Sequence, residues 1–495
     1  MSKTVSDIVS GLECTVIGSD QTEVEGLAYR SDAVKPGDAF FCIVGLKVDG
    51  HSFAQDAIDR GAKVIFVERK LYLADATDVC EVIVSDSRKA MAHAAAQFYD
   101  NPSKAFSLVG ITGTNGKTTT TYLVEHIARA ADLRTGVIGT VGVKMQDTFV
   151  KSARTTPEST DLQKMFADMR DARIDTVAME VSSHALDLLR TWDTAFAVTA
   201  FTNLTQDHLD YHHTFEAYFE AKALLFSSAY PATRVISIDD KWGKELLHRC
   251  SVAEENVIST GFDPTALIHP VSVEYAPAQT TVELEVRGAR YAFTYPLVGK
   301  FNVSNIMTAF GIGLALGIPA ETIVKALESA PQVPGRLQRV KASADGGVSV
   351  FVDYAHTPDA LAKALASIQN ITEGKTIVVF GCGGDRDSSK RSIMGEVALD
   401  ADFAVVTSDN PRTEDPNAII EDIVSGMEAG TDHYLVEPDR ALAIRAAIER
   451  AQAGDSVLIA GKGHEDYQLV GSEVRHFDDR EVAQDVLESL FASEA

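Results

Sequence analysis

Residues 113–119 read GTNGKTT, a spacing of glycine, lysine and hydroxyl side chains that suits phosphate chemistry. They follow the apolar run FSLVGIT and precede KTTTTYLVEHIARAAD, which has helical periodicity. Glycines let backbone N–H groups point at phosphate oxygens, and a helix N-terminus adds positive potential. Lys117 would reach the β- and γ-phosphates, and the Thr118 hydroxyl would ligate Mg²⁺. The segment therefore predicts a nucleotide-binding loop.

This loop is shorter than the standard pattern, because the glycine expected five residues before Gly116 is Ile111. A glycine turn in front of a capped helix would show similar residues. The context of strand, loop and helix favours nucleotide binding over that alternative.

Further polar residues follow later apolar runs. Glu180 ends TVAM and is placed like a Mg²⁺ ligand, although a surface glutamate at a strand end is a common alternative. His208 lies in TNLTQDHLDYH between Asp207 and Asp210, which makes a metal role plausible. We interpret His212 as a structural side chain, as we do His213. Spacing alone predicts that Lys222 is an ordinary exposed helix lysine.

The C-terminal third carries four unusual polar segments: DYAHTPDA, GCGGDRDSSKR, SDNPRTEDP and GKGHEDYQ. Each follows a strand-like run, and helical stretches separate the runs, as in a doubly wound parallel sheet. Ligands bind at the carboxyl ends of such strands. This region is therefore predicted to bind a ligand.

The elements that must position these residues indicate an α/β protein with several domains. The first hundred residues alternate short apolar runs with helical stretches, and a turn near residues 101–103 ends them. Strands and helices then alternate in the central part. Residues from about 251 to 295 alternate polar and apolar side chains, which predicts inserted antiparallel strands. The run VPGRLQRV, near residues 334–335, indicates a linker.

Composition limits the possible partners. The 495 residues include 45 Lys+Arg and 71 Asp+Glu, for a net charge of -26, which disfavours nucleic acid and anionic lipid. Five scattered cysteines are typical of a reducing compartment, and neither a secretory signal nor a membrane-length apolar run is visible. We expect a cytoplasmic monomer that acts on small molecules, without nucleic acid or membrane insertion.

Twelve segments in order resemble the Mur ligases. They are YRSDAVKPGD, GTNGKTT, TTP, EVSSHALDLLR, TNLTQDHLDYH, EAKALLF, GKFNVSN, PGRLQ, DYAHTPDAL, GCGGDRD, DNPRTEDP and GKGHEDYQ. The resemblance implies three α/β domains. Residues 1–101 would bind a UDP-linked precursor, residues 102–333 would form a central P-loop ATPase-type parallel-sheet domain, and residues 334–495 would form a Rossmann-like domain for an amino acid.

The resemblance also implies site residues. Lys222 would be carbamylated, so that its ammonium becomes an anion that helps to hold a second Mg²⁺. The implied catalytic group is Lys117, Glu180, His208 and Lys222, and the implied metal ligands are Thr118, Glu180, His208 and Lys222. The implied ATP contacts are Gly113, Thr114, Asn115, Gly116, Lys117, Thr118, Thr119, Asn302, Arg336, Asp353 and His356, with Asn305 nearby.

For the UDP precursor, the implied contacts are Ser31, Thr155, Thr156, Ser182 and Arg190. Taken singly, Asn305 and Thr155 would be interpreted as ordinary cap or loop residues. The family usually has Ser-Arg where this chain has Ser31 and Asp32, so Arg30 or Lys47 is a candidate replacement. A position that is often polar in the family is Leu188 here.

The implied reaction is ATP-dependent ligation in peptidoglycan precursor synthesis. ATP would phosphorylate the D-glutamyl carboxylate of UDP-N-acetylmuramoyl-L-alanyl-D-glutamate, and an amine would displace phosphate from the acyl phosphate. The DNPR segment resembles the version that selects meso-diaminopimelate, since an arginine fork suits its distal carboxylate. The implied amino-acid contacts are Arg386, Asp409, Asn410, Pro411, Arg412, Gly461 and Glu465.

Other interpretations remain. L-lysine or L-ornithine could be the amino acid in the same reaction. A related ligase, such as folylpolyglutamate synthase or the D-Ala-D-Ala-adding ligase, would share the phosphate loop but not DNPR. A nucleotide-binding scaffold with a degenerate site is a third interpretation, although such a protein needs no second metal site.

Overall fold

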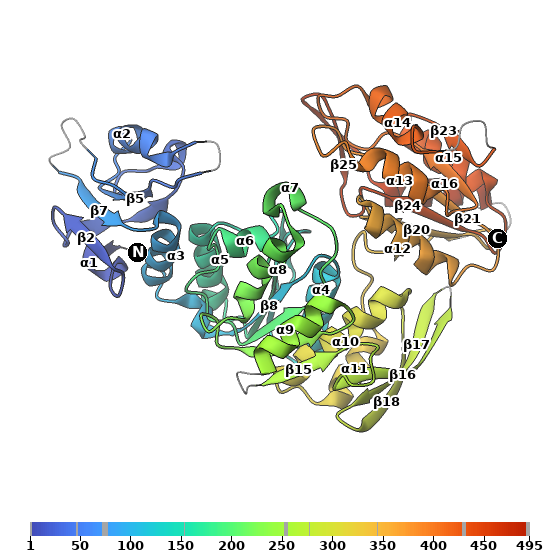
Figure 1. The fold of residues 1–495 in the computed structure, drawn as a ribbon, viewed down its shortest axis with the longest axis horizontal. Helices are drawn as coiled ribbons and strands as arrows, with labels where there is room; N and C mark the ends of the chain where they lie inside the picture. Colours follow the sequence, from blue (N-terminus) through green and yellow to red (C-terminus); the bar gives the residue numbers. More distant parts are fainter. Residues whose placement is uncertain are drawn as a thin grey trace.

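A computed structural model describes residues 2–45, 48–71, 78–152, 154–251, 256–276, 278–343, 345–427 and 432–491. Three sheets of five, eleven and six strands follow one another along the chain. Figure 1 shows the N-terminal part in blue, the central part in cyan to yellow and the C-terminal part in orange to red. The α/β fold class predicted from the sequence is confirmed.

The N-terminal sheet has the strand order β2-β7-β6-β5-β4, with β2 antiparallel and the others parallel. Buried Phe41 and Phe66 stack across neighbouring strands. The elements here are β1 (Lys3–Thr4), α1 (Val5–Ile8), β2 (Cys14–Ile17), β3 (Glu23–Val24), β4 (Gly26–Ala28), η1 (Ser31–Ala33), β5 (Asp38–Phe41), η2 (Gly50–Phe53), α2 (Ala54–Asp59), β6 (Val64–Val67), β7 (Cys80–Val84), α3 (Ser87–Phe98) and η3 (Pro102–Ala105).

The central sheet has the order β11-β10-β9-β12-β8-β13-β14-β15-β16-β17-β18. Successive residues Leu108 and Val109 of β8 enter different hydrophobic clusters, so both faces of this strand are covered. Its strands are β8 (Ser107–Thr112), β9 (Thr135–Ile138), β10 (Val143–Met145), β11 (Thr148–Val150), β12 (Thr176–Glu180), β13 (Val198–Phe201), β14 (Thr233–Ser237), β15 (Val257–Thr260), β16 (Ile268–Ala276), β17 (Gln279–Val286) and β18 (Ala289–Tyr295).

The helices of this part cover the two faces of the sheet (Figure 1). They are α4 (Lys117–Ala130), α5 (Ser159–Asp171), α6 (Ser183–Asp187), α7 (Leu209–His212), α8 (Phe215–Ala223), η4 (Leu224–Phe226), α9 (Lys241–Ser251), α10 (Lys300–Ala315) and α11 (Ala320–Glu328).

Both edges of the central sheet are antiparallel. The predicted alternation produces β16, β17 and β18, which extend one edge of the sheet as an antiparallel meander. At the other edge the β10–β11 hairpin pairs antiparallel with β9, an element that the sequence analysis did not predict. The sheet is therefore mixed rather than wholly parallel, and its parallel centre carries the phosphate loop.

The C-terminal sheet has the order β19-β20-β24-β21-β22-β23 and is parallel except for β19, as predicted for a doubly wound region. Its elements are β19 (Gln338–Arg339), β20 (Ser349–Asp353), α12 (Pro358–Gln369), β21 (Thr376–Phe380), α13 (Lys390–Ala398), β22 (Phe403–Val406), α14 (Pro416–Val424), β23 (Tyr434–Val436), α15 (Arg440–Arg450), β24 (Ser456–Ala460) and α16 (Asp479–Phe491), with the hairpin β25 (Tyr467–Val470) and β26 (Glu473–His476) beside it.

In the connection between the central and C-terminal parts, the backbone at Gly335 packs directly against the backbone of Gly463 and His464. Gly335 has φ +64°, and a Cβ added there would lie 2.2 Å from the backbone of Gly463 and 2.2 Å from the His464 nitrogen. The Tyr354 N–H donates to the Gly335 carbonyl at 2.9 Å. Only glycine fits both the backbone conformation and the space at this position.

A buried ion pair ties α15 to α16. The Arg440 guanidinium donates to both carboxylate oxygens of Asp479 at 2.7 Å, and both side chains are fully buried. We expect Asp479→Asn to lower the free energy of unfolding by about 3–5 kcal/mol, because it leaves a buried cation without its partner. Denaturant unfolding measures this loss. Replacing both residues by apolar side chains should restore most of it, and a single replacement without effect would contradict the prediction.

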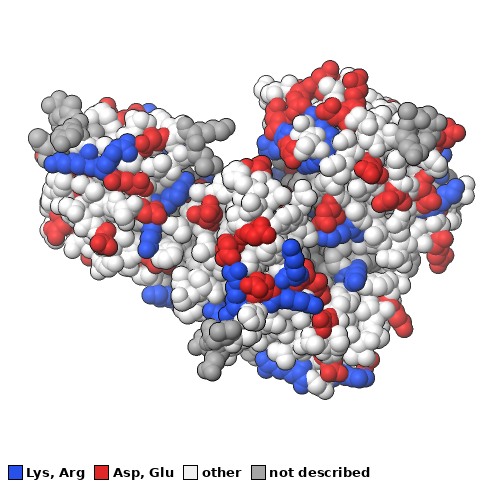
Figure 2. Space-filling view, in the orientation of Figure 1, with Lys and Arg blue, Asp and Glu red and all other residues white. Residues whose placement is uncertain are grey.

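The surface agrees with the acidic composition. On the face in Figure 2, acidic and basic side chains are interspersed and no broad basic area is visible. Among the described residues, none of the helices has the length and hydropathy required to cross a membrane.

Candidate active site

The phosphate loop predicted from GTNGKTT lies between β8 and α4. Gly116 adopts φ +85° as the residue before the helix, and a Cβ there would lie 2.3 Å from Asn305 Oδ1. A Cβ at Gly113 would lie 1.9 Å from Thr202 Oγ1. Both glycines are thus required by close packing, and the buried Asn305 lies against the loop rather than acting as a simple cap.

Two lysines share one carbonyl oxygen of this loop. Lys117 Nζ donates to the Gly113 carbonyl at 2.9 Å, and Lys222 Nζ donates to the same oxygen at 2.8 Å. Lys222 is only 1% exposed, so the expectation of an exposed helix lysine is wrong. Burial, and then the charge of Lys117, hold the pKa of Lys222 well below its ordinary value. Burial therefore favours the neutral form of this amine.

Glu180 is held in a fixed orientation at the end of β12. Its side chain is 1% exposed and accepts from the Thr140 N–H at 2.8 Å and from the Thr140 hydroxyl at 3.1 Å. The Thr140 and Thr155 hydroxyls lie 3.0 Å apart. A buried carboxylate that is held by neutral hydrogen-bond donors keeps acceptor capacity for a hard cation.

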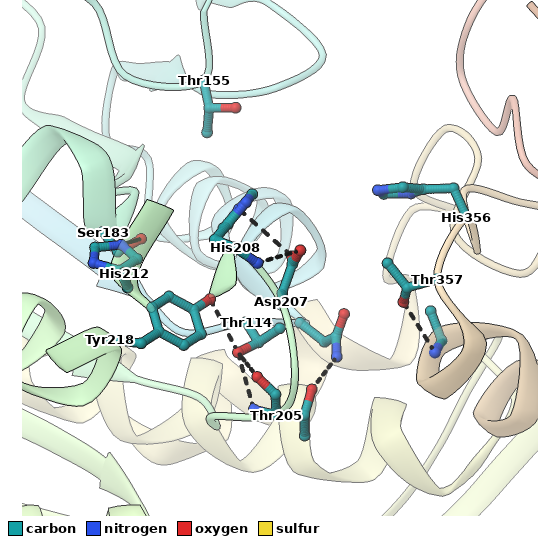
Figure 3. A network of polar contacts seen from close by, with 12 residues as sticks. Thr114, Thr155, Ser183, Thr205, Asp207, His208, His212, Tyr218, His356 and Thr357 are labelled. Carbon is teal, nitrogen blue, oxygen red and sulfur yellow. Dashed lines mark hydrogen bonds and ion pairs between the residues drawn. The ribbon is translucent and has the colours of Figure 1, made fainter. Parts of the chain in front are cut away.

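His208 lies where a tight turn leads into α7. Its φ is +53°, its Nε2 is 3.5 Å from Asp207 Oδ2, and its ring stacks edge-on against His184. Loss of solvation, partly offset by Asp207, lowers the pKa of His208 to about 4, so the imidazole is neutral and can coordinate a metal. Figure 3 shows His208 above the pair formed by Tyr218 and Thr114.

A second histidine of this region is packed into the fold. His212 is buried and its Nε2 lies 3.0 Å from Ser183 Oγ, as expected for a structural side chain. Beside it lies a cavity of about 490 Å³ that is lined by Asp187, Asp210, Tyr211, His212, His213 and Ala217.

The C-terminal part reaches the phosphate loop through one arginine. Arg336 Nη2 donates to Thr118 Oγ1 at 3.3 Å, and its guanidinium lies 4.8 Å from the centre of the Tyr354 ring. His356 points from the C-terminal part toward the region of His208 in Figure 3. Its Nδ1 lies 2.8 Å from the Tyr354 carbonyl. Arg336 and His356, predicted to contact ATP, therefore approach the loop from across the connection.

Asp353, also in the predicted ATP group, is held at the end of β20. It accepts from the Leu337 N–H at 2.7 Å. Burial raises the pKa of Asp353 to about 6, although Arg336 lowers it. Asn302 lies deeper, where its amide donates to the Val298 carbonyl at 2.8 Å and accepts from Asn305 at 3.0 Å.

The raised pKa of Asp353 makes stability depend on pH. A carboxyl group whose folded pKa is raised stabilises the fold while protonated, and this contribution is lost as pH rises through about 6. We expect Asp353→Asn to raise the free energy of unfolding at pH 8 by on the order of 1–3 kcal/mol. The gain should disappear below pH 4. Denaturant unfolding at both pH values measures it, and a gain that is independent of pH would contradict it.

The residues predicted to bind the precursor form two groups. Thr156 Oγ1 donates to the Glu180 carbonyl at 2.9 Å and accepts from the Ser182 N–H at 3.1 Å. Arg190 donates to the Thr156 carbonyl at 3.1 Å and pairs with Glu158 at 2.9 Å. These residues lie next to Glu180. Ser31 lies apart, in η1 of the N-terminal part.

Arg30 and Lys47 are the candidates for the basic contact that is replaced near Ser31, and the structure describes only Arg30. Arg30 is exposed and pairs with Asp32 at 2.5 Å. Lys47 lies outside the described residues. Arg30 is therefore partly neutralised by the acidic residue that departs from the family pattern.

The predicted amino-acid contacts gather where β21, β22 and β24 end. Asn410 donates to Glu465 at 2.8 Å and accepts from the fully buried Lys462 at 3.0 Å. A Cβ at Gly461 would lie 2.5 Å from Asp409 Oδ2. Burial, and then the charge of Asp409, raise the pKa of Glu465. The two acids therefore form a negative site, which Lys462 partly balances.

Two arginines stand on the loops that follow β21 and β22. Arg412 adopts φ +53° after Pro411 and donates through Nη1 to the Gly384 carbonyl at 2.7 Å. Arg386 is exposed and donates to the Asp385 carbonyl at 3.1 Å. An acidic site with guanidinium groups on neighbouring loops would suit a molecule that carries ammonium and carboxylate groups at both ends.

Three residues of the site were missed by the sequence analysis. Thr140 orients Glu180, and Lys462 balances Asp409 and Glu465. Asn203 accepts from the Asn115 N–H at 3.0 Å and donates to the Asn115 carbonyl at 3.1 Å. Asn203 and Lys462 stand inside motifs that follow strands, which is a usable signal. Thr140 belongs to no such motif.

The described residues contain no cluster of three or more His, Cys, Asp or Glu side chains that could hold a metal ion. The predicted ligand set does not require such a cluster, because it includes a threonine and a modified lysine. Glu180 supplies a carboxylate, Thr118 a hydroxyl and His208 an imidazole, while Lys222 can contribute only as a carbamate. These oxygen-rich donors fit Mg²⁺.

Comparison with known proteins matches three successive segments of the chain to related family models. Residues 23–99 match the model described as "Mur ligase family, catalytic domain", residues 111–313 match "Mur ligase middle domain", and residues 335–463 match "Mur ligase, glutamate ligase domain".

Individual proteins are similar over nearly the whole length. UDP-N-acetylmuramoyl-L-alanyl-D-glutamate–2,6-diaminopimelate ligase of Clostridium botulinum is 43% identical over 485 residues, which cover 98% of this chain and 99% of that protein. A solved structure with the same enzyme name has 31% identity and a TM-score of 0.72, and covers 99% of both chains. Folylpolyglutamate synthase of Mycobacterium tuberculosis, at 19% identity and a TM-score of 0.62 over 75% of this chain and 91% of that chain, shares the fold alone.

Proposed function

The chain belongs to the Mur ligase family, and we propose that it is the ATP-dependent ligase that joins meso-diaminopimelate to UDP-N-acetylmuramoyl-L-alanyl-D-glutamate. The reaction forms a carbon–nitrogen bond in peptidoglycan precursor synthesis. The observation that carries this proposal is that Arg386 and Arg412 stand on two loops joined by Gly384, at the sheet edge that also carries Asp409 and Glu465. L-Lysine has no distal carboxylate that would use both arginines.

ATP would bind with its phosphates at the Gly113–Gly116 turn, where the loop N–H groups and the N-terminus of α4 face the anion. Lys117 would move from the loop carbonyls that it now contacts to the phosphate oxygens. Asn302 and Asn305, buried at the start of α10, would shape the adenine end. Arg336, Asp353 and His356 would approach from the C-terminal part.

Mg²⁺ would be held by Thr118, Glu180, His208 and carbamylated Lys222. When bound, two such ions neutralise the negative charge that gathers where nucleotide and acyl donor meet. Thr140 keeps the Glu180 carboxylate in one orientation through two hydrogen bonds. In its neutral form, which burial favours, the Lys222 amine would react with CO₂, forming an N–C bond and losing one proton.

The D-glutamyl carboxylate would lie near Arg190, Thr156 and Ser182. Its oxygen attacks the γ-phosphorus of ATP; the new O–P bond forms as the bond to ADP breaks, and Lys117 stabilises the transferred group. The neutral amine of the amino acid then attacks the acyl carbon. The resulting tetrahedral intermediate expels phosphate, and the nitrogen releases one proton to form the amide.

The amino acid would bind in the C-terminal part. Arg386 would pair with one carboxylate and Arg412 with the distal one, while Asp409 and Glu465 would receive the distal ammonium group. Asn410 and Gly461 hold these acids in place through a hydrogen bond and through close packing. The chain would work in the cytoplasm as a monomer.

Phosphate release with purified protein tests this function. The protein is supplied with Mg²⁺-ATP, the UDP-muramoyl-dipeptide and, in turn, meso-diaminopimelate, L-lysine or L-ornithine. We expect release with meso-diaminopimelate only. Release with folate and glutamate instead would indicate a folylpolyglutamate synthase, and no release with any precursor would indicate a binding protein without catalysis.

A further inference from the structure

The two arginines proposed to bind the amino acid stand on separate loops. Arg386 follows β21, and Arg412 follows β22, so the backbone of neither loop fixes their separation. Gly384 connects the loops, because its N–H donates to the Asn410 carbonyl at 2.9 Å and its carbonyl accepts from Arg412 at 2.7 Å. Further contacts are needed to hold the pair at a constant distance.

Glu414 supplies the strongest of these contacts. Its carboxylate accepts from the Asp385 N–H on the first loop and pairs with Arg391 of α13 at 2.9 Å. The Arg391 side chain is 3% exposed, and its other arm pairs with Asp422 of α14 at 2.9 Å. The Arg391 hydrogen bond and the Asp385 N–H hold the pKa of Glu414 below its ordinary value, so the carboxylate is charged at neutral pH.

A second contact joins the same two loops. The Thr413 hydroxyl donates to Asp385 Oδ1 at 2.7 Å, and the Thr413 N–H donates to Asp385 Oδ2 at 3.2 Å. Asp385 is therefore held from both ends: its backbone by Glu414 and its side chain by Thr413. It immediately precedes Arg386, so whatever moves Asp385 also moves that arginine.

We propose that Glu414 is a positioning residue that sets the separation of Arg386 and Arg412, and thereby favours an amino acid with a carboxylate at each end. This inference rests on the proposed function. Glu414 itself need not touch the substrate. Bidentate guanidinium–carboxylate pairs demand a close geometric match, and a displacement of about 1 Å in a positioning group can cost about 100-fold in rate.

The test measures steady-state kinetics for Glu414→Ala and Glu414→Gln in the full-length protein. For Glu414→Ala we expect the KM for meso-diaminopimelate to rise by about 10- to 100-fold, with the KM values for ATP and the UDP-dipeptide within about twofold of wild type. Glu414→Gln, which keeps the size of the side chain, should lie between. Glu421→Gln is the matched control: Glu421 is exposed on α14 and makes no side-chain hydrogen bond or ion pair within the described residues.

The double variant Glu414→Ala/Arg412→Ala separates positioning from a general structural role. If Glu414 acts through Arg412, the double variant should be no worse than Arg412→Ala alone. Fully additive losses would overturn the inference. So would a wild-type KM for meso-diaminopimelate in Glu414→Ala, or an equal rise in all three KM values together with a lower melting temperature in both Glu414 variants. A wild-type protein that ignores meso-diaminopimelate would instead overturn the proposed function.

Discussion

Replacing Lys222 by alanine is expected to lower the rate of ATP-dependent ligation by about 10³-fold. Lys222 is buried, shares the Gly113 carbonyl with Lys117, and forms no ion pair with a carboxylate among the described residues. A permanent ammonium group is disfavoured there, whereas a carbamate would place a negative charge next to Lys117. Phosphate release at saturating substrates measures the effect, and calorimetry with ATP shows whether the nucleotide still binds.

Arginine at this position provides the sharper comparison. Lys222→Arg keeps a positive charge but cannot form the carbamate, so we expect it to be as inactive as the alanine variant. Added acetate should partly restore Lys222→Ala by supplying a carboxylate, and should not restore Lys222→Arg. Lys244→Ala, a change of an exposed lysine in α9, should leave the rate unchanged. Substantial activity in Lys222→Arg would contradict the carbamate.

Arg412→Ala is expected to lower kcat/KM for meso-diaminopimelate by about 10³-fold, while the Kd for ATP stays unchanged. The guanidinium group is already held in place by the Gly384 carbonyl and by its own turn after Pro411. Its loss would leave the distal carboxylate without a bidentate partner. Initial rates over a range of diaminopimelate concentrations measure the first quantity, and ATP calorimetry measures the second.

An exposed arginine of the same part is the control for Arg412. Arg445 lies on α15, where it pairs with Glu449, and Arg445→Ala should keep wild-type kinetics. If Arg412→Ala used meso-diaminopimelate as well as wild type does, the selection of the amino acid would have to reside elsewhere. An increased use of L-lysine by Arg412→Ala would support the assignment further.

Much of the architecture could be predicted because the polar segments lie directly after their strands in the sequence. The phosphate loop and the four polar segments of the C-terminal part each follow a strand, and parallel strands bring their carboxyl ends to one edge. Sequence alone therefore predicted that Lys117 follows β8, that Glu180 ends β12 and that the four polar segments follow their strands, as the structure shows. The edge hairpin β10–β11 was missed because its strands are three residues each and largely exposed or half-buried.

The environment of Lys222 could not be predicted from its own helix. The ring of Tyr218, on the same helix, lies 4.5 Å from Lys222 Nζ, but the hydrogen-bond partner that buries the amine is Gly113, which is 109 residues away. The same holds for Thr140, whose importance arises only because β9 lies beside β12. Family resemblance supplied the role of Lys222, and the roles of individual site residues remain predictions for the experiments above.

At the contact of Gly335 with Gly463 and His464, two main chains meet without a side chain between them. Gly463 is equally confined, since a Cβ there would lie 2.6 Å from Tyr354 Cβ. Few substitutions can be tolerated at this contact. A single added methyl group would push the segment that carries Arg336 away from the segment that carries Glu465. The substitution Gly335→Ala would therefore change how the central and C-terminal parts approach each other without altering any reacting group.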